Sequence, residues 1–161
     1  MDDHIIFRPT EENDRSWMRG VMRKWWGSES EVVWKTKYKP AEKNVYIALL
    51  NGAKVGLVIF RYDAALNEIM NLTVSDTHPQ VGRQLILSAV EDAKKHNSER
   101  MIVGTTNDIT NTLRFYRNIG FRLQELRVDT VKESRKKKLK ISMVSNCHIP
   151  IQNEIELEMV Q

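Results

Sequence analysis

The sequence has 161 residues, of which 41% are hydrophobic and 29% are charged, and this balance is typical of one globular domain, which we expect to span residues 1–161. No apolar stretch approaches the ~18 residues that a membrane-spanning helix needs, and the acidic N-terminus lacks the pattern of a signal peptide, so we expect a cytoplasmic protein without a membrane partner. The single cysteine, Cys147, excludes an internal disulfide, and the formal net charge is +4.

The N-terminal part of the chain predicts a strand followed by an amphipathic helix. Residues 4–8 are strand-like, and Pro9-Thr10 offers a helix start. Apolar residues then recur at helical spacing and predict a face that packs on a sheet: Trp17, Met18, Val21, Met22, Trp25 and Trp26. Gly27-Ser28 ends this helix, and residues 29–43 show no clear pattern.

The middle of the chain predicts a β-hairpin. Residues 45–50 and 53–60 are rich in β-forming residues, and Asn51-Gly52 joins them. This dipeptide is the one best suited to the positive φ angles of a tight hairpin turn. Residues 68–74 are a third strand-like run, so at least three strands are expected in this part of the sheet.

A βαβ unit follows the hairpin. After the third strand-like run, two apolar rows at helical spacing predict a helix: Val81, Leu85 and Ala89 in one row, and Ile86, Val90 and Ala93 in the other. Residues 101–105 are again strand-like. A strand, a helix and a strand in so short a segment predict two parallel strands joined by a right-handed crossover.

The C-terminal part completes the predicted sheet. We expect a helix over residues 111–119, capped by Asp108 or Thr110 and ended by Gly120 in the left-handed conformation. Two further strand-like segments are residues 121–128 and 154–160. The elements together predict an α+β fold with a six- or seven-stranded, mainly antiparallel sheet. One central pair of strands would be parallel, and about four helices would flank the sheet.

One segment carries most of the basic charge. Residues 132–140 contain six basic residues and one acidic residue, so the rest of the chain is close to neutral. Such a cluster is either a solvated helix face or a contact for phosphate, in nucleic acid or in a cofactor. No helix-turn-helix, zinc-finger or stacking-aromatic pattern supports nucleic acid. We favour the solvated face and keep a nucleic-acid-binding module at residues 132–140 as an alternative.

The loop before the helix of the βαβ unit is placed to bind a phosphate. It leaves the carboxyl end of a central strand and enters a helix N-terminus, where N–H groups and the helix dipole favour an anion. Gly82 would let the backbone approach a pyrophosphate closely, and Arg83 can pair with it. A single glycine in a βα turn also fits a purely structural role.

A tyrosine near the end of the next helix strengthens this interpretation. Tyr116 lies in Phe115-Tyr116-Arg117-Asn118-Ile119-Gly120-Phe121. Together with the glycine-containing loop, this segment resembles the GNAT superfamily of acyl-CoA-dependent N-acyltransferases, whose pattern includes a Phe-Tyr-x-x-x-Gly-Phe type of motif. The resemblance runs from Ile5 to about Phe121 and fits the final strand. Of the two small residues usual in the family's loop, only Gly82 is present.

The resemblance implies the transfer of an acetyl group from acetyl-CoA to a primary amine, and no spacing of His, Cys, Asp or Glu in the sequence suggests a metal. Backbone groups on the strand before the loop would bind the pantetheine arm: Leu72, Thr73 and Val74. Backbone N–H groups of the loop would bind the pyrophosphate: Thr77, Gln80, Val81, Gly82 and Arg83. Asn107 or Asn111 would steady the pantetheine or its phosphate end. Tyr116 would protonate the departing thiolate, and Glu68 would take a proton from the amine. The alternatives are a core aromatic for Tyr116 and an exposed strand residue for Glu68.

The resemblance places the acceptor site between the end of the first helix and the last strand. The residues implied there are Trp26, Ser28 and Glu154. Trp-Gly-Ser at residues 26–28 and Ile-Pro-Ile at residues 149–151 are similar to a bacterial subgroup of the superfamily. The acceptor stays open between a small-molecule and a peptidyl amine, and a homodimer is compatible because relatives are often dimers. A domain that binds acyl-CoA as a sensor or scaffold, without turnover, is the main alternative.

Overall fold

The computed structural model describes residues 3–26, 31–33, 36–38, 44–62, 67–75, 79–106, 110–127 and 154–160. The strands are β1 (Ile5–Pro9), β2 (Glu31–Val33), β3 (Thr36–Tyr38), β4 (Asn44–Leu50), β5 (Ala53–Tyr62), β6 (Asn67–Val74), β7 (Arg100–Thr106), β8 (Arg122–Arg127) and β9 (Glu154–Val160). The helices are a 3₁₀ turn, η1 (Glu12–Asp14), and α1 (Arg15–Trp26), α2 (Pro79–Lys95) and α3 (Thr110–Ile119).

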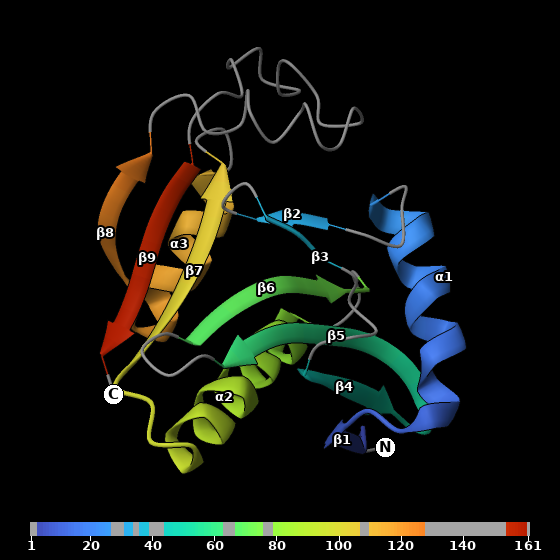
Figure 1. Cartoon of the computed structure of the whole chain (residues 1–161). Coiled ribbons are helices and arrows are strands. Elements are labelled where there is room, and N and C mark those ends of the chain that lie inside the picture. Colours follow the sequence, from blue (N-terminus) through green and yellow to red (C-terminus); the bar gives the residue numbers. More distant parts are fainter. Residues whose placement is uncertain are drawn as a thin grey trace.

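The described strands form one large mixed sheet and a small separate one. The large sheet has seven strands in the order β1-β4-β5-β6-β7-β9-β8, and β2 pairs with β3 alone (Figure 1). β6 and β7 are parallel, and every other pair in the described part of the large sheet is antiparallel. The predicted sheet and its one central parallel pair are confirmed. Three α-helices and the 3₁₀ turn lie in the described part, where about four helices were expected.

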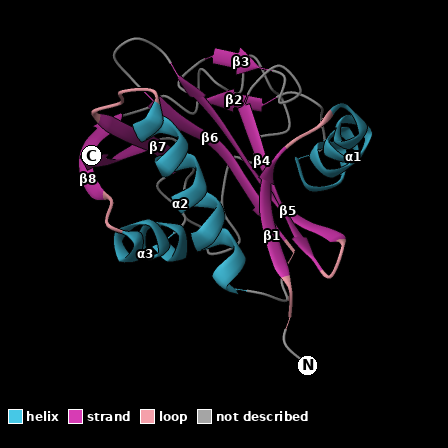
Figure 2. Cartoon of the chain, turned by 90° about the horizontal axis from the view of Figure 1, so that it is seen from below, coloured by secondary structure: helices cyan, strands magenta, loops and turns pink. Residues whose placement is uncertain are grey.

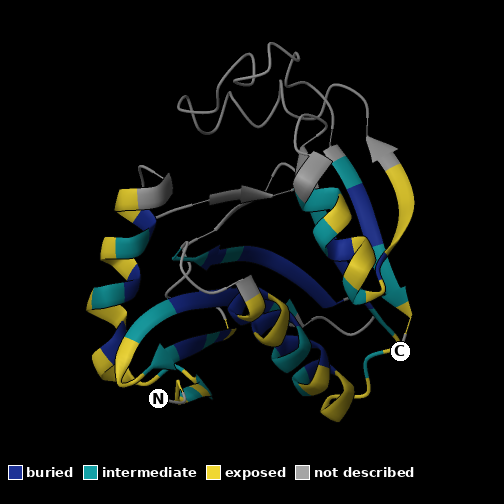
Figure 3. Ribbon diagram, turned by 180° about the vertical axis from the view of Figure 1, so that it is seen from behind, coloured by how far each residue is buried: buried dark blue, intermediate teal, exposed yellow. Residues whose placement is uncertain are grey.

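Helices cover both faces of the large sheet. α2 and α3 lie on one face and α1 on the other (Figure 2). The central strands carry most of the buried positions, so the core lies along the middle of the sheet (Figure 3). On the α2 side the core includes Phe60, Leu85 and Tyr116, and on the α1 side it includes Met22 and Leu57. None of the described helices is both long and apolar enough to cross a membrane.

Two local predictions about turns are confirmed. Asn51 and Gly52 have φ angles of 50° and 85°, so both occupy the positive region that the β4–β5 hairpin requires. Gly120 has a φ of 122° and ends α3, where its N–H donates to the carbonyl of Tyr116 at 3.2 Å. The N–H of Phe121 donates to the same carbonyl at 3.0 Å, which satisfies a backbone acceptor at the helix end.

The start of the first helix differs from the prediction at Pro9-Thr10. Pro9 still belongs to β1, and the Thr10 N–H donates to the carbonyl of Val45 at 3.0 Å. The chain therefore stays on the sheet for longer, and α1 begins only at Arg15, after the 3₁₀ turn. The sequence pattern alone did not reveal this, because the bond to Val45 joins segments far apart in the chain.

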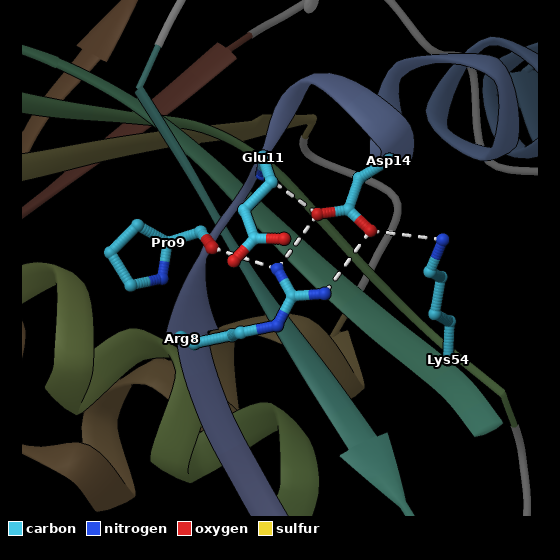
Figure 4. Close-up of polar contacts among 5 residues, drawn as sticks. All are labelled: Arg8, Pro9, Glu11, Asp14 and Lys54. Atoms are coloured by element: carbon cyan, nitrogen blue, oxygen red, sulfur yellow. Dashed lines mark hydrogen bonds and ion pairs between the residues drawn. The ribbon is translucent and has the colours of Figure 1, made fainter. Parts of the chain in front are cut away.

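Asp14 fixes the junction between the sheet and α1 (Figure 4). Its side chain is 2% exposed, and its oxygens accept bonds from Arg8 at 2.7 and 3.2 Å and from the Glu11 N–H at 2.7 Å. Lys54 Nζ lies 2.9 Å from Asp14 Oδ1. These bonds, above all the one from Arg8, hold the pKa of Asp14 well below its usual range. One carboxylate thus links β1, β5 and the start of α1.

Candidate active site

The two parallel strands separate partway along their length. Among the described residues, β6 and β7 pair only at Asn67–Met101, Glu68–Ile102 and Ile69–Val103. β6 continues to Val74 and β7 to Thr106 without further pairs between them. The backbone groups along these facing edges must find partners elsewhere, because a buried N–H or C=O that lacks a hydrogen bond is costly. The separation therefore offers a hydrogen-bonding edge to a ligand.

A β-bulge explains where the separation begins. Ile59 pairs with Asn71 and Phe60 pairs with Ile69, which leaves Met70 as an extra residue on β6. A bulge bends its strand and increases the local twist. Met70 directly follows Ile69, the last residue of β6 that pairs with β7, so the bend lies at the point where the strands part.

Strand alternation determines which backbone groups face the gap. The Ser75 N–H donates to the Val55 carbonyl on β5 at 2.8 Å. Hydrogen-bonded pairs alternate along antiparallel strands, so Thr73 also turns its backbone toward β5, whereas Leu72 and Val74 turn theirs toward the gap. The predicted role of backbone groups in binding pantetheine therefore fits Leu72 and Val74. It does not fit Thr73, whose hydroxyl donates to Asn71 Oδ1 at 2.7 Å.

The first turn of α2 lies beyond the end of β6. The first N–H groups of a helix have no partner within the helix, and a proline at the first position has no N–H to leave unpaired. In this turn Val81 is completely buried and Gln80 is exposed. The Val81 side chain is therefore part of the core and is not a contact for a ligand. The N–H groups from Gln80 to Gly82 form the described part of the predicted phosphate site.

Gly82 also has a packing role. A Cβ at this position would lie 3.4 Å from Phe115 Cζ and 3.6 Å from Leu72 Cδ2, so the helix packs closely on α3 and β6 here. An alanine would make ordinary contacts, but a larger side chain would displace the Phe115 ring. The neighbouring Arg83 is exposed, and its Nη1 lies 3.5 Å from the carbonyl of Asn118 near the end of α3.

Tyr116 lies in the core on the α2 side of the sheet. Its side chain is 5% exposed, and its ring meets Phe115 and Phe121 edge to face, with centroid distances of 5.1 and 5.4 Å. In the described part of the chain no group hydrogen-bonds to its hydroxyl. Burial raises the pKa of Tyr116 well above its ordinary value, so the phenol stays protonated far above neutral pH. The ring packs as a core residue would, and its hydroxyl keeps the proton that an acid needs.

Glu68 is completely buried and bonded to an arginine. Arg61 Nε and Nη2 each lie 2.7 Å from Glu68 Oε2, across the β5–β6 pair. The alternative of an exposed strand residue is therefore wrong, and the role of Glu68 as the base stays a prediction. Glu68 also pairs in register with Ile102, next to the last β6–β7 pair, so it lies close to the point of separation.

Other predicted site residues fall wholly or partly outside the described residues. Ser28, Thr77 and Asn107 lie outside, as do residues 132–140. For three more the structure gives only the backbone position: Trp26 at the end of α1, Asn111 in α3 and Glu154 in β9. Among the residues that are described, no group of three or more His, Cys, Asp or Glu side chains could hold a metal ion.

Sequence reasoning missed a cavity between α1 and the sheet. It has a volume of about 370 Å³, and its lining includes Gly20 and Lys24 of α1, Lys54 of β5 and Thr73 of β6. It also missed Arg61, the partner of Glu68. The available signal for the cavity was Gly20 itself, a glycine in the middle of an otherwise regular amphipathic helix.

A mixed sheet whose central parallel strands part beside a helix N-terminus defines the class of GNAT-like acyltransferase folds. Residues 8–121 match the model of the acetyltransferase (GNAT) family, and the chain belongs to this family. It is 30% identical over 151 residues to the uncharacterized protein YxbD of Bacillus subtilis, which covers 92% of this chain and 94% of that protein.

Solved structures share the fold at low sequence identity. A GNAT family acetyltransferase from Elizabethkingia anophelis with acetyl-CoA bound superposes with a TM-score of 0.71 at 20% identity, over 99% of this chain and all of that chain. A putative streptothricin acetyltransferase from Bacillus anthracis, in complex with acetyl coenzyme A, superposes with a TM-score of 0.69 at 16% identity, over 98% of this chain and all of that chain.

Proposed function

We propose that this protein is a cytoplasmic N-acetyltransferase that transfers an acetyl group from acetyl-CoA to a primary amine of a small-molecule or peptidyl acceptor. The observation that carries the proposal is the separation of β6 and β7, with the backbones of Leu72 and Val74 directed into the gap. Membership of the family supports it, as do two proteins of the same fold that hold acetyl-CoA.

In this proposal the chain holds acetyl-CoA mainly through its backbone. The N–H and C=O groups of Leu72 and Val74 bind the amide-containing pantetheine arm, much as a neighbouring strand would. The N–H groups of the first turn of α2, with Thr77 of the preceding loop, bind the pyrophosphate, which the helix dipole favours. Arg83 adds positive charge at this end, and Asn107 or Asn111 steadies the arm.

Two side chains are proposed to move protons. An alkyl ammonium with a pKa of ~10 is not a nucleophile, so a carboxylate must first remove a proton, and we assign this to Glu68, directly or through water. The amine nitrogen then forms a bond to the thioester carbonyl carbon, and the C–S bond breaks as the electron pair leaves with sulfur. A strand N–H at the gap stabilises the charge on the carbonyl oxygen. Tyr116 protonates the departing thiolate, and the second proton that the nitrogen loses as the amide forms restores the Tyr116 phenol.

One further reading is favoured by a specific observation. Glu68 is completely buried and already bonded to Arg61, and the loop keeps only one of the family's small residues. These features also suit a domain that binds acyl-CoA as a sensor or scaffold without turnover. The two functions differ in one measurable property, the release of thiol.

Calorimetric titration with acetyl-CoA, followed by a thiol-release assay with polyamines, amino acids, aminoglycosides and peptides, tests the proposal. We expect saturable binding of one acetyl-CoA per chain and release of CoA thiol that depends on an added amine. Binding without release for any amine would favour the sensor. Failure to bind acetyl-CoA at all would overturn both functions.

A further inference from the structure

A buried amide side chain lies on β6 just after the point where the parallel strands part. Asn71 directly follows Met70, the extra residue of the bulge, and precedes Leu72, whose backbone is directed into the gap. Asn71 is 7% exposed, so the protein nearly encloses it. Burying a polar side chain is costly unless its donors and acceptors find partners. The partners of Asn71 therefore indicate the role of this position.

The side chain of Asn71 is bonded within the protein at its oxygen and not at its nitrogen. The Thr73 hydroxyl donates to Asn71 Oδ1 at 2.7 Å, and this bond fixes the orientation of the amide. In the described part of the chain no group accepts a hydrogen bond from Asn71 Nδ2. An amide nitrogen carries two N–H donors, and leaving buried donors unpaired is costly. The nitrogen is therefore suited to an oxygen of a bound molecule.

A second buried amide on the same strand has partners within the protein at its nitrogen. Asn67 is 4% exposed, and its Nδ2 donates to Ser98 Oγ and lies 3.5 Å from the carbonyl oxygen of Arg100. These contacts join the start of β6 to the start of β7 and account for the burial of Asn67. The described structure offers no such account for the nitrogen of Asn71.

The bulge turns Asn71 toward the face of the sheet on which α1 lies (Figure 2). Ile69 belongs to the core on the α2 side, so its neighbour Glu68 faces α1. Strict alternation would return position 71 to the α2 side, but the extra residue, Met70, shifts the pattern. Met70 packs in the cluster on the α1 side, and Asn71 shares that face with Thr73. Glu68 and Asn71 therefore lie on one face of β6.

The side chains of Glu68 and Asn71 are close enough to act on one small molecule. A strand rises by about 3.3 Å per residue, so the three residue steps between them span at most about 10 Å. Glu68 is the proposed base for the amine nitrogen, and Asn71 offers its N–H donors on the same face, beside the gap. An acceptor whose nitrogen is near Glu68 can therefore place an oxygen near Asn71.

We propose, building on the proposed N-acetyltransferase function, that Asn71 determines acceptor specificity by donating a hydrogen bond from Nδ2 to an oxygen of the acceptor. The preferred acceptor is an amine with a carbonyl or hydroxyl oxygen a few bonds from the nitrogen, such as an α-amino carbonyl compound or an amino alcohol. Alkyl amines without this oxygen are poor acceptors, because they leave the buried donors of Asn71 unpaired. The acetyl transfer itself is unchanged.

Matched amines that differ only in the oxygen-bearing group test this selection. The pairs are glycinamide with isobutylamine, and ethanolamine with propylamine. Calorimetry measures binding to the protein saturated with CoA, and thiol release gives kcat/KM, expressed per unprotonated amine because the members of a pair differ in pKa. We expect the oxygen-bearing member to bind about tenfold more tightly in at least one pair. The pair that responds distinguishes a carbonyl from a hydroxyl oxygen.

Asn71→Leu tests the residue itself, with Asn67→Leu as a matched control. Both variants replace a buried amide of β6 by an apolar side chain of similar shape, but only Asn67 has protein partners at its nitrogen. We expect Asn71→Leu to remove most of the preference within the pair that responds. Asn67→Leu should leave that preference unchanged and should lower the melting temperature more than Asn71→Leu does.

NMR of the parent protein gives a second measurement that needs no variant. The side-chain amide signals of Asn71 should shift when the oxygen-bearing amine is added to the protein saturated with CoA. Its oxygen-free partner should shift them much less. Signals that respond equally to both members of each pair would overturn the assignment of Asn71.

The binding and turnover readouts separate this proposal from the proposed function. Preferential binding of the oxygen-bearing amine, lost in Asn71→Leu, supports the role of Asn71 even if no thiol is released, a result that would overturn the proposed catalysis alone. Turnover that is equal within both pairs, or binding of neither member, overturns the role of Asn71 and leaves the acetyltransferase function standing. A loss in Asn71→Leu that is equal for both members also overturns it, because Nδ2 then does not recognise the acceptor oxygen.

Discussion

Arg61 reaches a single oxygen of Glu68 with two of its nitrogens, each at 2.7 Å, and thereby holds a completely buried carboxylate beside the point where β6 and β7 part. Burying a carboxylate is costly unless a cation and hydrogen bonds compensate it. The ion pair with Arg61 offsets part of this cost. The position near the gap makes proton transfer to Glu68 the most direct test of the proposed mechanism.

Glu68→Gln should lower kcat/KM by about 10²–10⁴, the usual contribution of a general base, because the amide has nearly the same shape but cannot accept the proton. The Kd for acetyl-CoA should stay near that of the parent protein. Arg61→Lys, which keeps a cation beside the carboxylate, is the control and should cost much less activity. Thiol-release kinetics and calorimetry measure both effects. If the activity of Glu68→Gln stays within about twofold of that of the parent, Glu68 is a structural ion-pair residue and not the base.

Tyr116→Phe should lower kcat more than it weakens acetyl-CoA binding. The ring contacts with Phe115 and Phe121 survive the change, and in the described residues the hydroxyl makes no hydrogen bond that folding would lose. The free energy of unfolding should therefore change little, which urea titration checks. Equal losses in kcat and in affinity would show that the hydroxyl is a binding contact and not the acid.

The raised pKa of Tyr116 also predicts a dependence of stability on pH. The unfolded phenol ionises near pH ~10, whereas burial keeps the folded phenol protonated to higher pH. The unfolded state is therefore favoured increasingly above about pH 10, and stability falls as the pH rises. Tyr116→Phe should lose less stability than the parent between about pH 9 and 11. Identical curves for the two proteins would contradict the burial argument.

Gly82→Ala and Gly82→Val should behave differently. The alanine Cβ would lie 3.4 Å from Phe115 and 3.6 Å from Leu72, both ordinary contacts, so folding and acetyl-CoA affinity should stay close to those of the parent. The branched valine would push against Phe115 and shift the first turn of α2, which should weaken acetyl-CoA binding about tenfold or more. Calorimetry and melting curves measure both changes. An unchanged affinity in Gly82→Val would move the phosphate site away from this turn.

Asp14→Asn should lower the free energy of unfolding at pH 7 by about 2 to 4 kcal/mol, because Arg8 and Lys54 lose the anion they share. The pKa of Asp14 is depressed in the folded state, so its contribution is present above the unfolded value of ~3.9 and is lost as the pH falls toward the folded value. Urea titrations at pH 7 and pH 3 should therefore show a smaller difference in the free energy of unfolding between variant and parent at pH 3. If this difference is the same at both pH values, the charge of Asp14 is not its source.

Local patterns were sufficient for much of the fold. Asn51-Gly52 predicted the hairpin because both residues readily adopt the positive φ angles of so tight a turn, and the strand-like pattern of residues 154–160 predicted β9. The βαβ unit followed from element order, because short crossovers have one favoured hand. These features depend on residues that are close together in the chain, so they can be recognised from the sequence alone.

Tertiary structure alone decided the site. β9 lies between β7 and β8 although β8 precedes it in sequence, and the bulge at Met70 parts β6 from β7. Arg61 meets Glu68, and Gly20 opens a cavity toward Thr73, only because strand register and helix position bring distant segments together. The amino-acid sequence determined which segments are strands and helices, through periodicity and turn chemistry. The pairing between remote segments depends on the packing of the whole chain. This pairing determined which side chains face the gap and the cavity.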